Sequence, residues 1–163
     1  MAKTVIRERR AGDLEQCVRA LRRVHEADGY PIVWPRDPVR WLSPAAVAHA
    51  WVALAAPARA GDSPGGVLGH VLLLRTDTPR TYEIARLFVS PAGRGLGLGT
   101  ALLETAGVRA AGEGYGLELE VVADERSYAI ALYERTGWRR TGTVTAEWTR
   151  PDGGCVQVHR YVR

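Results

Sequence analysis

The stretch RGLGLGTALLETA, residues 94–106, places three glycines at alternate positions directly before apolar residues with helical spacing. Glycine has no Cβ, so the backbone amides of such a loop can come close to a ligand. The first turn of the following helix adds unpaired N–H groups and the positive end of the helix dipole. Together these features favour an anion, most often a phosphate. The alternative is a glycine-rich turn that only begins a helix.

Two common phosphate-binding loops do not fit this stretch. A Walker loop ends in Gly-Lys-Ser/Thr, and residues 94–106 contain no lysine. A dinucleotide-binding loop needs G-x-G-x-x-G after the first strand of a doubly wound sheet, but the sixth position here is Thr100 or Leu102. The remaining pattern is Arg-x-x-Gly-x-Gly, formed by Arg94, Gly97 and Gly99 after the strand-like sequence LFVSP.

The overall composition limits the class of protein. The chain has 163 residues, 46% of them hydrophobic, and a net charge of +4, which fits a single domain over residues 1–163. Its arginines are scattered rather than gathered in a stripe, so we expect no nucleic-acid partner. No long apolar run or signal-peptide pattern is present, so we expect a cytoplasmic protein without a membrane partner. The cysteines and histidines lack ligand spacing, so we expect no metal.

Hydrophobic periodicity predicts a mixed sheet covered by helices. Strands are expected at 4–9, 49–56, 67–75, 81–89 and 116–123, with a terminal hairpin at 138–148 and 155–162. Helices are expected from a capping box at Asp13 and Gln16 to about Gly29, from the glycine loop to about residue 112, and over 127–137. The segment between Gly29 and residue 45 is expected to be irregular, with a short helix. Strands 81–89 and 116–123 flank a βαβ crossover and should be parallel neighbours.

Two stretches of this sequence resemble the GNAT superfamily of N-acetyltransferases. TYEIARLFVSPAGRGLGLGTALLETA (81–106) is similar to the fourth strand, coenzyme A loop and third helix of that superfamily. IALYERTGW (130–138) is similar to its later helix, and the order of elements also matches. The resemblance implies an α/β (α+β type) fold. It further implies a mixed sheet of six or seven strands, about four helices, and parallel fourth and fifth strands that splay apart.

The resemblance also implies that acetyl-CoA is the acyl donor. Backbone groups of the fourth strand would pair with pantetheine, and the loop amides would bind pyrophosphate. The residues that match these roles are Leu87, Phe88, Val89, Arg94, Gly95, Leu96, Gly97, Leu98, Gly99 and Thr100. The Arg94 side chain either assists the phosphates or is a solvated loop arginine, and the side chains of Leu96 and Leu98 are expected to pack.

An N-acyltransferase must take a proton from the amine and give one to the departing thiolate. The resemblance places the proton donor at Tyr133, with packing beneath the cofactor as the alternative. Glu83 matches a strand position at which many relatives carry a catalytic carboxylate, and the alternative is a solvated strand edge. Glu118 and Glu120 are weaker candidates, and the Val89 amide is a candidate for holding the thioester oxygen.

The acceptor is less well defined by the sequence. The resemblance implies that the first helix, the segment after it and the late hairpin border the acceptor site. These elements indicate Asp28, Tyr30, Trp34 and Trp41, and also Trp138, Trp148 and Tyr161, with core packing as the alternative for the aromatic residues. Arg126 stands where many relatives carry an asparagine near the cofactor. We expect acetyl transfer to a primary amine of a small molecule or peptide by direct attack. An inactive acyl-CoA-binding regulatory domain is the alternative, and pairing of the C-terminal strands could form a homodimer.

Overall fold

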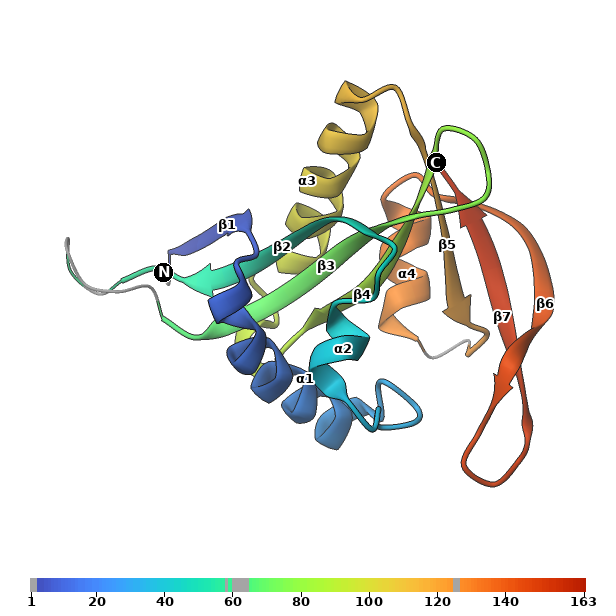
Figure 1. The fold of residues 1–163 in the computed structure, drawn as a ribbon, viewed down its shortest axis with the longest axis horizontal. Coiled ribbons are helices and arrows are strands. Elements are labelled where there is room, and N and C mark those ends of the chain that lie inside the picture. Colours follow the sequence, from blue (N-terminus) through green and yellow to red (C-terminus); the bar gives the residue numbers. More distant parts are fainter. Residues whose placement is uncertain (1–2, 58, 60–64, 125–126) are drawn as a thin grey trace.

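The computed structural model describes residues 3–57, 59, 65–124 and 127–163 (Figure 1). A seven-stranded sheet with the order β1-β2-β3-β4-β5-β7-β6 forms its centre. The strands are β1 (Thr4–Glu8), β2 (Val47–Ala55), β3 (Val67–Arg75), β4 (Thr81–Val89), β5 (Gly116–Val122), β6 (Arg139–Thr149) and β7 (Cys155–Val162). Within the described residues, no helix is long and apolar enough to cross a membrane.

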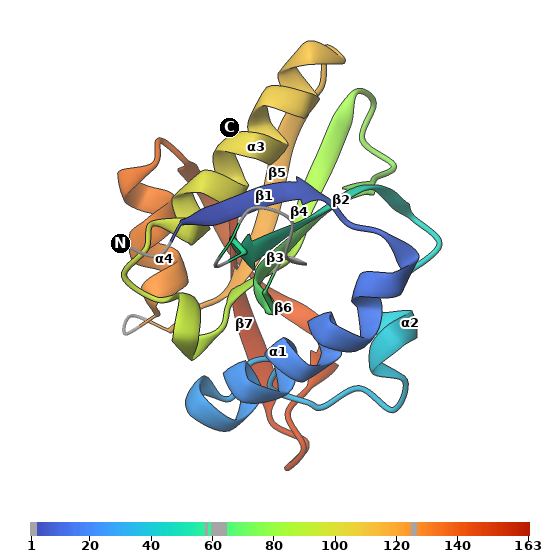
Figure 2. The same ribbon diagram turned by 90° about the vertical axis from the view of Figure 1, so that its left-hand side faces the viewer.

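Helices cover both faces of the sheet (Figure 2). They are α1 (Leu14–Asp28), α2 (Pro38–Leu42), α3 (Leu98–Gly112) and α4 (Tyr128–Arg135), with short 3-10 turns η1 (Ala11–Asp13) and η2 (Pro91–Gly93). Buried residues of α1 and α2 form one apolar cluster with β2, β3 and β4. Residues of α3 and α4 form a second cluster. The two clusters fit a sheet whose central strands are buried on both faces.

Local sequence explains most of these elements. In α1, Cys17, Leu21 and Val24 are buried, as the helical spacing predicts, and Gly29 ends the helix with a left-handed φ of 71°. The capping box expected at Asp13 is wrong. Asp13 already has helical dihedral angles, so its carboxylate reaches backward and accepts from the Arg10 amide and the Arg7 guanidinium instead.

The sheet confirms the predicted meander of β2, β3 and β4 and the parallel pairing of β4 with β5. This parallel pairing is short, because it joins Thr81 to Gly116, Tyr82 to Leu117 and Glu83 to Glu118 and then stops. Beyond Glu83 the two parallel strands diverge as predicted, while β5 stays paired with β7 along its other edge (Figure 1). The terminal hairpin places its second strand, β7, against β5, an order that the sequence pattern did not specify.

Candidate active site

The divergence of β4 from β5 leaves one edge of β4 open. After Glu83, the described part of β4 pairs with β3 alone. Ser90 donates its amide to the Leu68 carbonyl at 2.8 Å. Since amides alternate between the two sides of an antiparallel strand, the preceding amide, that of Val89, faces the open edge. A backbone donor is therefore available inside the opening.

The predicted residues Leu87, Phe88 and Val89 lie along this open edge. The Phe88 side chain is buried in the α1 cluster, whereas Leu87 and Val89 pack partly against the α3 cluster. The side chains of these three residues therefore pack into the two cores on opposite faces of the sheet. Their backbone groups face the opening between β4 and β5.

The glycine loop lies between η2 and α3. Gly95 and Gly97 adopt left-handed φ values of 75° and 70°, which strain residues with a Cβ. Gly99 serves a different purpose, because a Cβ there would lie 3.1 Å from the Leu132 side chain of α4. Leu98 is buried as expected, but Leu96 is 42% exposed, so the expectation that it packs is wrong.

The backbone of this loop is rich in unused donors. Within the described part of the chain, the backbone N–H groups of residues 95–100, including that of Thr100, donate no hydrogen bond to a backbone carbonyl outside α3. The first amides of α3 lack partners inside the helix for geometric reasons, and the helix dipole adds positive potential at the same place. The loop can therefore hold an anion through main-chain groups.

Arg94 and Asp28 are partners of each other. Arg94 donates to the Asp28 carboxylate, which stands at the last residue of α1. The sequence assigned these two residues separately to the cofactor and the acceptor. The ion pair instead joins the glycine loop to the start of the segment between α1 and α2.

Tyr133 lies on α4 and is 6% exposed. Its ring packs against Trp138 and Tyr161, with centroid separations of 5.8 and 6.0 Å. Its hydroxyl has no hydrogen-bond partner among the described residues. Burial raises the pKa of this hydroxyl, and the nearby Tyr30 raises it further. Tyr133 therefore keeps its proton at neutral pH, as a proton donor must.

Glu83 lines a pocket of about 350 Å³ on the sheet face opposite α3. The same pocket is bordered by Glu118 and Glu120, and Glu120 is paired with Arg160 at 2.8 Å. Burial raises the pKa of Glu83, and the carboxylate of Glu120 raises it further. Because it holds a proton more tightly than an ordinary glutamate, Glu83 is a better base when ionised.

Aromatic residues border the site from the α1–α2 segment. Tyr30 has its pKa raised to about 12 by burial, against the opposing effect of Arg86. Trp41 carries the Arg86 guanidinium 4.0 Å above its ring. Trp34 instead packs against His25, at 5.3 Å between ring centroids, beneath Arg22.

Sequence reasoning missed Arg86. This arginine follows Ala85 in a strand that is otherwise mostly apolar, and its charge in that position is the signal that could have indicated it. Arg126, which stands at the position of a common asparagine, lies outside the described residues. In the described ranges, no group of three or more histidine, cysteine, aspartate or glutamate residues could hold a metal ion.

The sequence matches the model of the acetyltransferase (GNAT) family over residues 17–138. The chain belongs to this family, which confirms the resemblance in its sequence. No curated protein sequence matches the chain.

Solved structures share the fold at low sequence identity. Arabidopsis thaliana NAA60 in complex with a bisubstrate analogue has a TM-score of 0.76 and 19% identity, covering 99% of this chain and 97% of that one. The ribosomal-protein-S18-alanine N-acetyltransferase of Escherichia coli has a TM-score of 0.73 and 19% identity, with 98% and 92% covered. Spermidine N-acetyltransferase from Vibrio cholerae in complex with CoA and spermine has a TM-score of 0.73 and 19% identity, with 98% and 94% covered.

Proposed function

We propose that this protein transfers an acetyl group from acetyl-CoA to a primary amine by direct attack. The observation that carries the proposal is the opening between β4 and β5, which begins after Glu83 and which the Val89 amide faces. The glycine loop follows that strand after the short η2 turn. An opening flanked by a backbone edge and an anion-binding loop suits a long ligand with phosphates at one end.

The residues present fit coenzyme A. The amides of residues 95–100 would hold the pyrophosphate, and Gly95 and Gly97 keep the loop free of side chains that would obstruct this approach. Leu87, Phe88 and Val89 would offer backbone groups to pantetheine. Bound acetyl-CoA supplies an activated thioester.

Two side chains on opposite faces of the sheet would transfer the protons of the reaction, one accepting a proton from the amine and one donating a proton to the leaving thiolate. Glu83 would accept the amine proton, directly or through a water molecule, because burial and Glu120 make it a stronger base than usual. Tyr133 would donate its proton to the departing sulfur, since its hydroxyl is protonated and unpartnered among the described residues. The Val89 amide would hold the thioester oxygen as that oxygen gains negative charge.

The acceptor would enter between the α1–α2 segment and the acidic face of the sheet. Tyr30 borders this region, while Asp28 acts through Arg94 and Trp34 packs on α1. The pocket is lined by three carboxylates, those of Glu83, Glu118 and Glu120, and by one arginine. This excess of negative charge favours a small-molecule or peptide amine that arrives as a cation.

A screen of amines with acetyl-CoA tests the proposal. The panel would contain polyamines, amino acids, aromatic amines and short peptides with free N-termini, and free thiol release would be followed. Release that depends on an amine supports the proposal. Measurable acetyl-CoA binding without release for any amine would instead support an inactive acyl-CoA-binding regulatory domain.

A further inference from the structure

His70 lies in β3, is fully buried, and forms polar contacts with one residue directly after β1 and one from β4. Its Nε2 lies 2.8 Å from an Arg9 guanidinium nitrogen, and its Nδ1 lies 2.9 Å from the Arg86 carbonyl oxygen. A guanidinium donates and cannot accept, so Nε2 must accept from Arg9. The ring proton therefore resides on Nδ1, which donates to the Arg86 carbonyl.

The Arg86 carbonyl belongs to an irregular part of β4. Arg86 has a φ of 52°, and the register between β3 and β4 shifts between His70 and Leu72. A left-handed conformation is unfavourable for a residue other than glycine, so such bulges persist where surrounding contacts hold them. The His70 hydrogen bond is one such contact, and it reaches the bulge from the neighbouring strand.

Arg9 fixes the other side of the imidazole ring. Besides His70, it donates to the Leu42 carbonyl at 2.6 Å and the Ser43 hydroxyl at 2.7 Å, both at the end of α2. Trp41, in the same helix, carries the Arg86 guanidinium. The bulge is thus held through its backbone by His70 and through its side chain by α2.

The bulge is close to the groups proposed to bind acetyl-CoA. Leu87 to Val89 follow Arg86 directly, and the ring of His70 stacks on Phe88 with a centroid separation of 5.2 Å. A displacement at Arg86 would therefore shift the Val89 amide, because the two are in the same short stretch of strand. Misplacing a catalytic contact by about 1 Å can lower the rate roughly 100-fold.

We infer that His70, oriented by Arg9, is a positioning residue that holds the β4 bulge and thereby sets the Val89 amide and the open strand edge for acetyl transfer. This inference rests on the proposed function. Burial lowers the pKa of His70 to about 3. The ring is therefore neutral at the pH of ordinary assays, and its single donor and single acceptor stay as assigned.

Two substitutions separate the two nitrogens of the ring. In His70→Asn the side-chain amide reaches the position of Nδ1 and can still donate to Arg86. In His70→Gln it reaches the position of Nε2 and can meet Arg9, but no donor remains for Arg86. We expect His70→Gln to lower kcat about 10- to 100-fold with little change in the KM of the amine, and His70→Asn to stay within about threefold of wild type.

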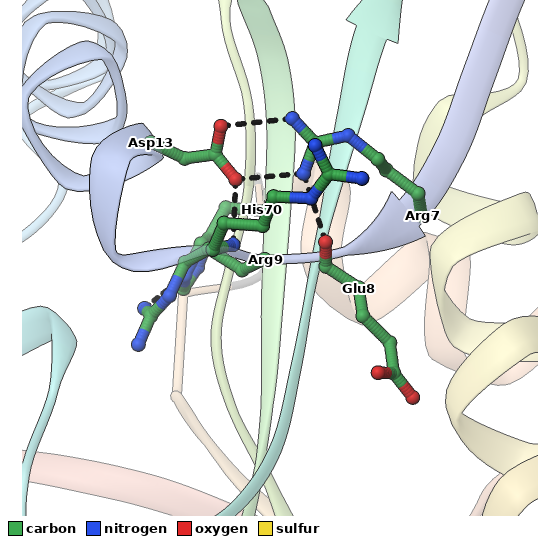
Figure 3. A network of polar contacts seen from close by, with 6 residues as sticks. Arg7, Glu8, Arg9, Asp13 and His70 are labelled. Carbon is green, nitrogen blue, oxygen red and sulfur yellow. Dashed lines mark hydrogen bonds and ion pairs between the residues drawn. The ribbon is translucent and has the colours of Figure 1, made fainter.

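Arg7→Gln is the matched control. Arg7 forms a bidentate pair with Asp13 at 2.7 and 2.9 Å in the same region (Figure 3), and none of its hydrogen bonds within the described ranges reaches β4. The Arg7→Gln enzyme should have a lower free energy of unfolding than wild type and the same kcat. A His70→Gln enzyme with kcat within about twofold of wild type, or His70→Asn impaired as strongly as His70→Gln, would overturn the inference.

Spectroscopy distinguishes failure of this inference from failure of the proposed function. In the wild-type protein, the imidazole ¹⁵N signals of His70 should show a proton on Nδ1 and none on Nε2. The amide signals of residues 86–89 should shift in His70→Gln and much less in His70→Asn. A proton on Nε2 would overturn the inference even if His70→Gln does not fold, and unchanged amide signals in a folded His70→Gln would do the same. Neither result depends on acetyl transfer.

Discussion

Glu83 of β4 pairs with Glu118 of β5, and this is the last pair before the two strands diverge. Like charges directly opposite each other on neighbouring strands are destabilising, and burial adds to the cost of ionising Glu83. A carboxyl placed where the sheet opens therefore costs stability. Its position is best understood through the chemistry proposed for the opening.

Glu83→Gln should remove the acid limb that Glu83 contributes to the pH profile of kcat/KM. In the wild-type enzyme, activity should fall as the pH drops through the pKa of Glu83, which lies above the ordinary glutamate value, because a base must be deprotonated. The substitution should also lower kcat roughly 100-fold. Glu104→Gln, on an exposed face of α3, is the control. An unchanged acid limb in Glu83→Gln would show that another group accepts the proton.

Tyr133→Phe should lower kcat about 100-fold while the KM for acetyl-CoA changes little, because the hydroxyl acts on the departing thiol. Stability should hold, since the described residues give that hydroxyl no hydrogen-bond partner. Steady-state rates and thermal melting measure both effects. With an acetyl thioester whose leaving thiol is more acidic, Tyr133→Phe should lose less activity than it does with acetyl-CoA. An equal loss with both thioesters would contradict the role of proton donor.

Gly97→Ala should weaken coenzyme A binding and lower the free energy of unfolding by about 1 kcal/mol, because the left-handed φ of 70° disfavours a Cβ. Gly107→Ala is the matched control inside α3, where a Cβ meets Leu117 at an ordinary 3.9 Å. Alanine there should stabilise the helix by about 0.5–1 kcal/mol and leave binding unchanged. Calorimetric titration and urea unfolding would compare the two. Equal affinities for coenzyme A in both variants would count against the loop as its site.

Asp28→Asn should tighten coenzyme A binding about two- to fivefold at low salt, because it removes a negative charge beside the glycine loop and releases Arg94. The gain should shrink as ionic strength rises, since the pair is partly exposed. Glu26→Gln, an exposed residue of the same helix, should have little effect. Weaker binding by Asp28→Asn would indicate that the ion pair organises the loop for its ligand.

Acidification should destabilise the fold through His70. Its pKa of about 3 in the folded protein lies below the ordinary value of 6.5, so between these two pH values the unfolded chain binds a proton that the folded protein excludes. The free energy of unfolding should therefore fall by up to about 1.4 kcal/mol for each pH unit across that window. Urea unfolding of wild type and His70→Asn from pH 7 to 4 would measure the difference. Parallel curves would mean that His70 does not carry this dependence.

The sequence predicted most helices and strands because their signals are local. Periodicity gave the bounds of β3 and β4 as the structure has them, and Gly29 ended α1 as expected. The prediction at Asp13 failed because Asp13 itself belongs to a 3-10 turn, which directs its carboxylate toward Arg10 and Arg7. The bulge at Arg86 could not be predicted, because it depends on the register of two strands.

Contacts between distant segments could not be predicted from the sequence either. The Arg9–His70 contact spans 61 residues and the Arg94–Asp28 pair spans 66. No periodicity in the chain encodes such separations. The roles of Tyr133 and Glu83, and pairing of the C-terminal strands in a homodimer, stay predictions.

We propose that acetyl-CoA is held by the glycine loop and the open edge of β4. Titrating the ¹⁵N-labelled protein with acetyl-CoA and following each backbone amide tests it most directly. We expect the largest shifts at residues 95–100 and at Val89. If those signals stay in place while others move, for example around the groove lined by Trp51, Thr105 and Arg109, acetyl-CoA binds elsewhere and the proposed site is wrong.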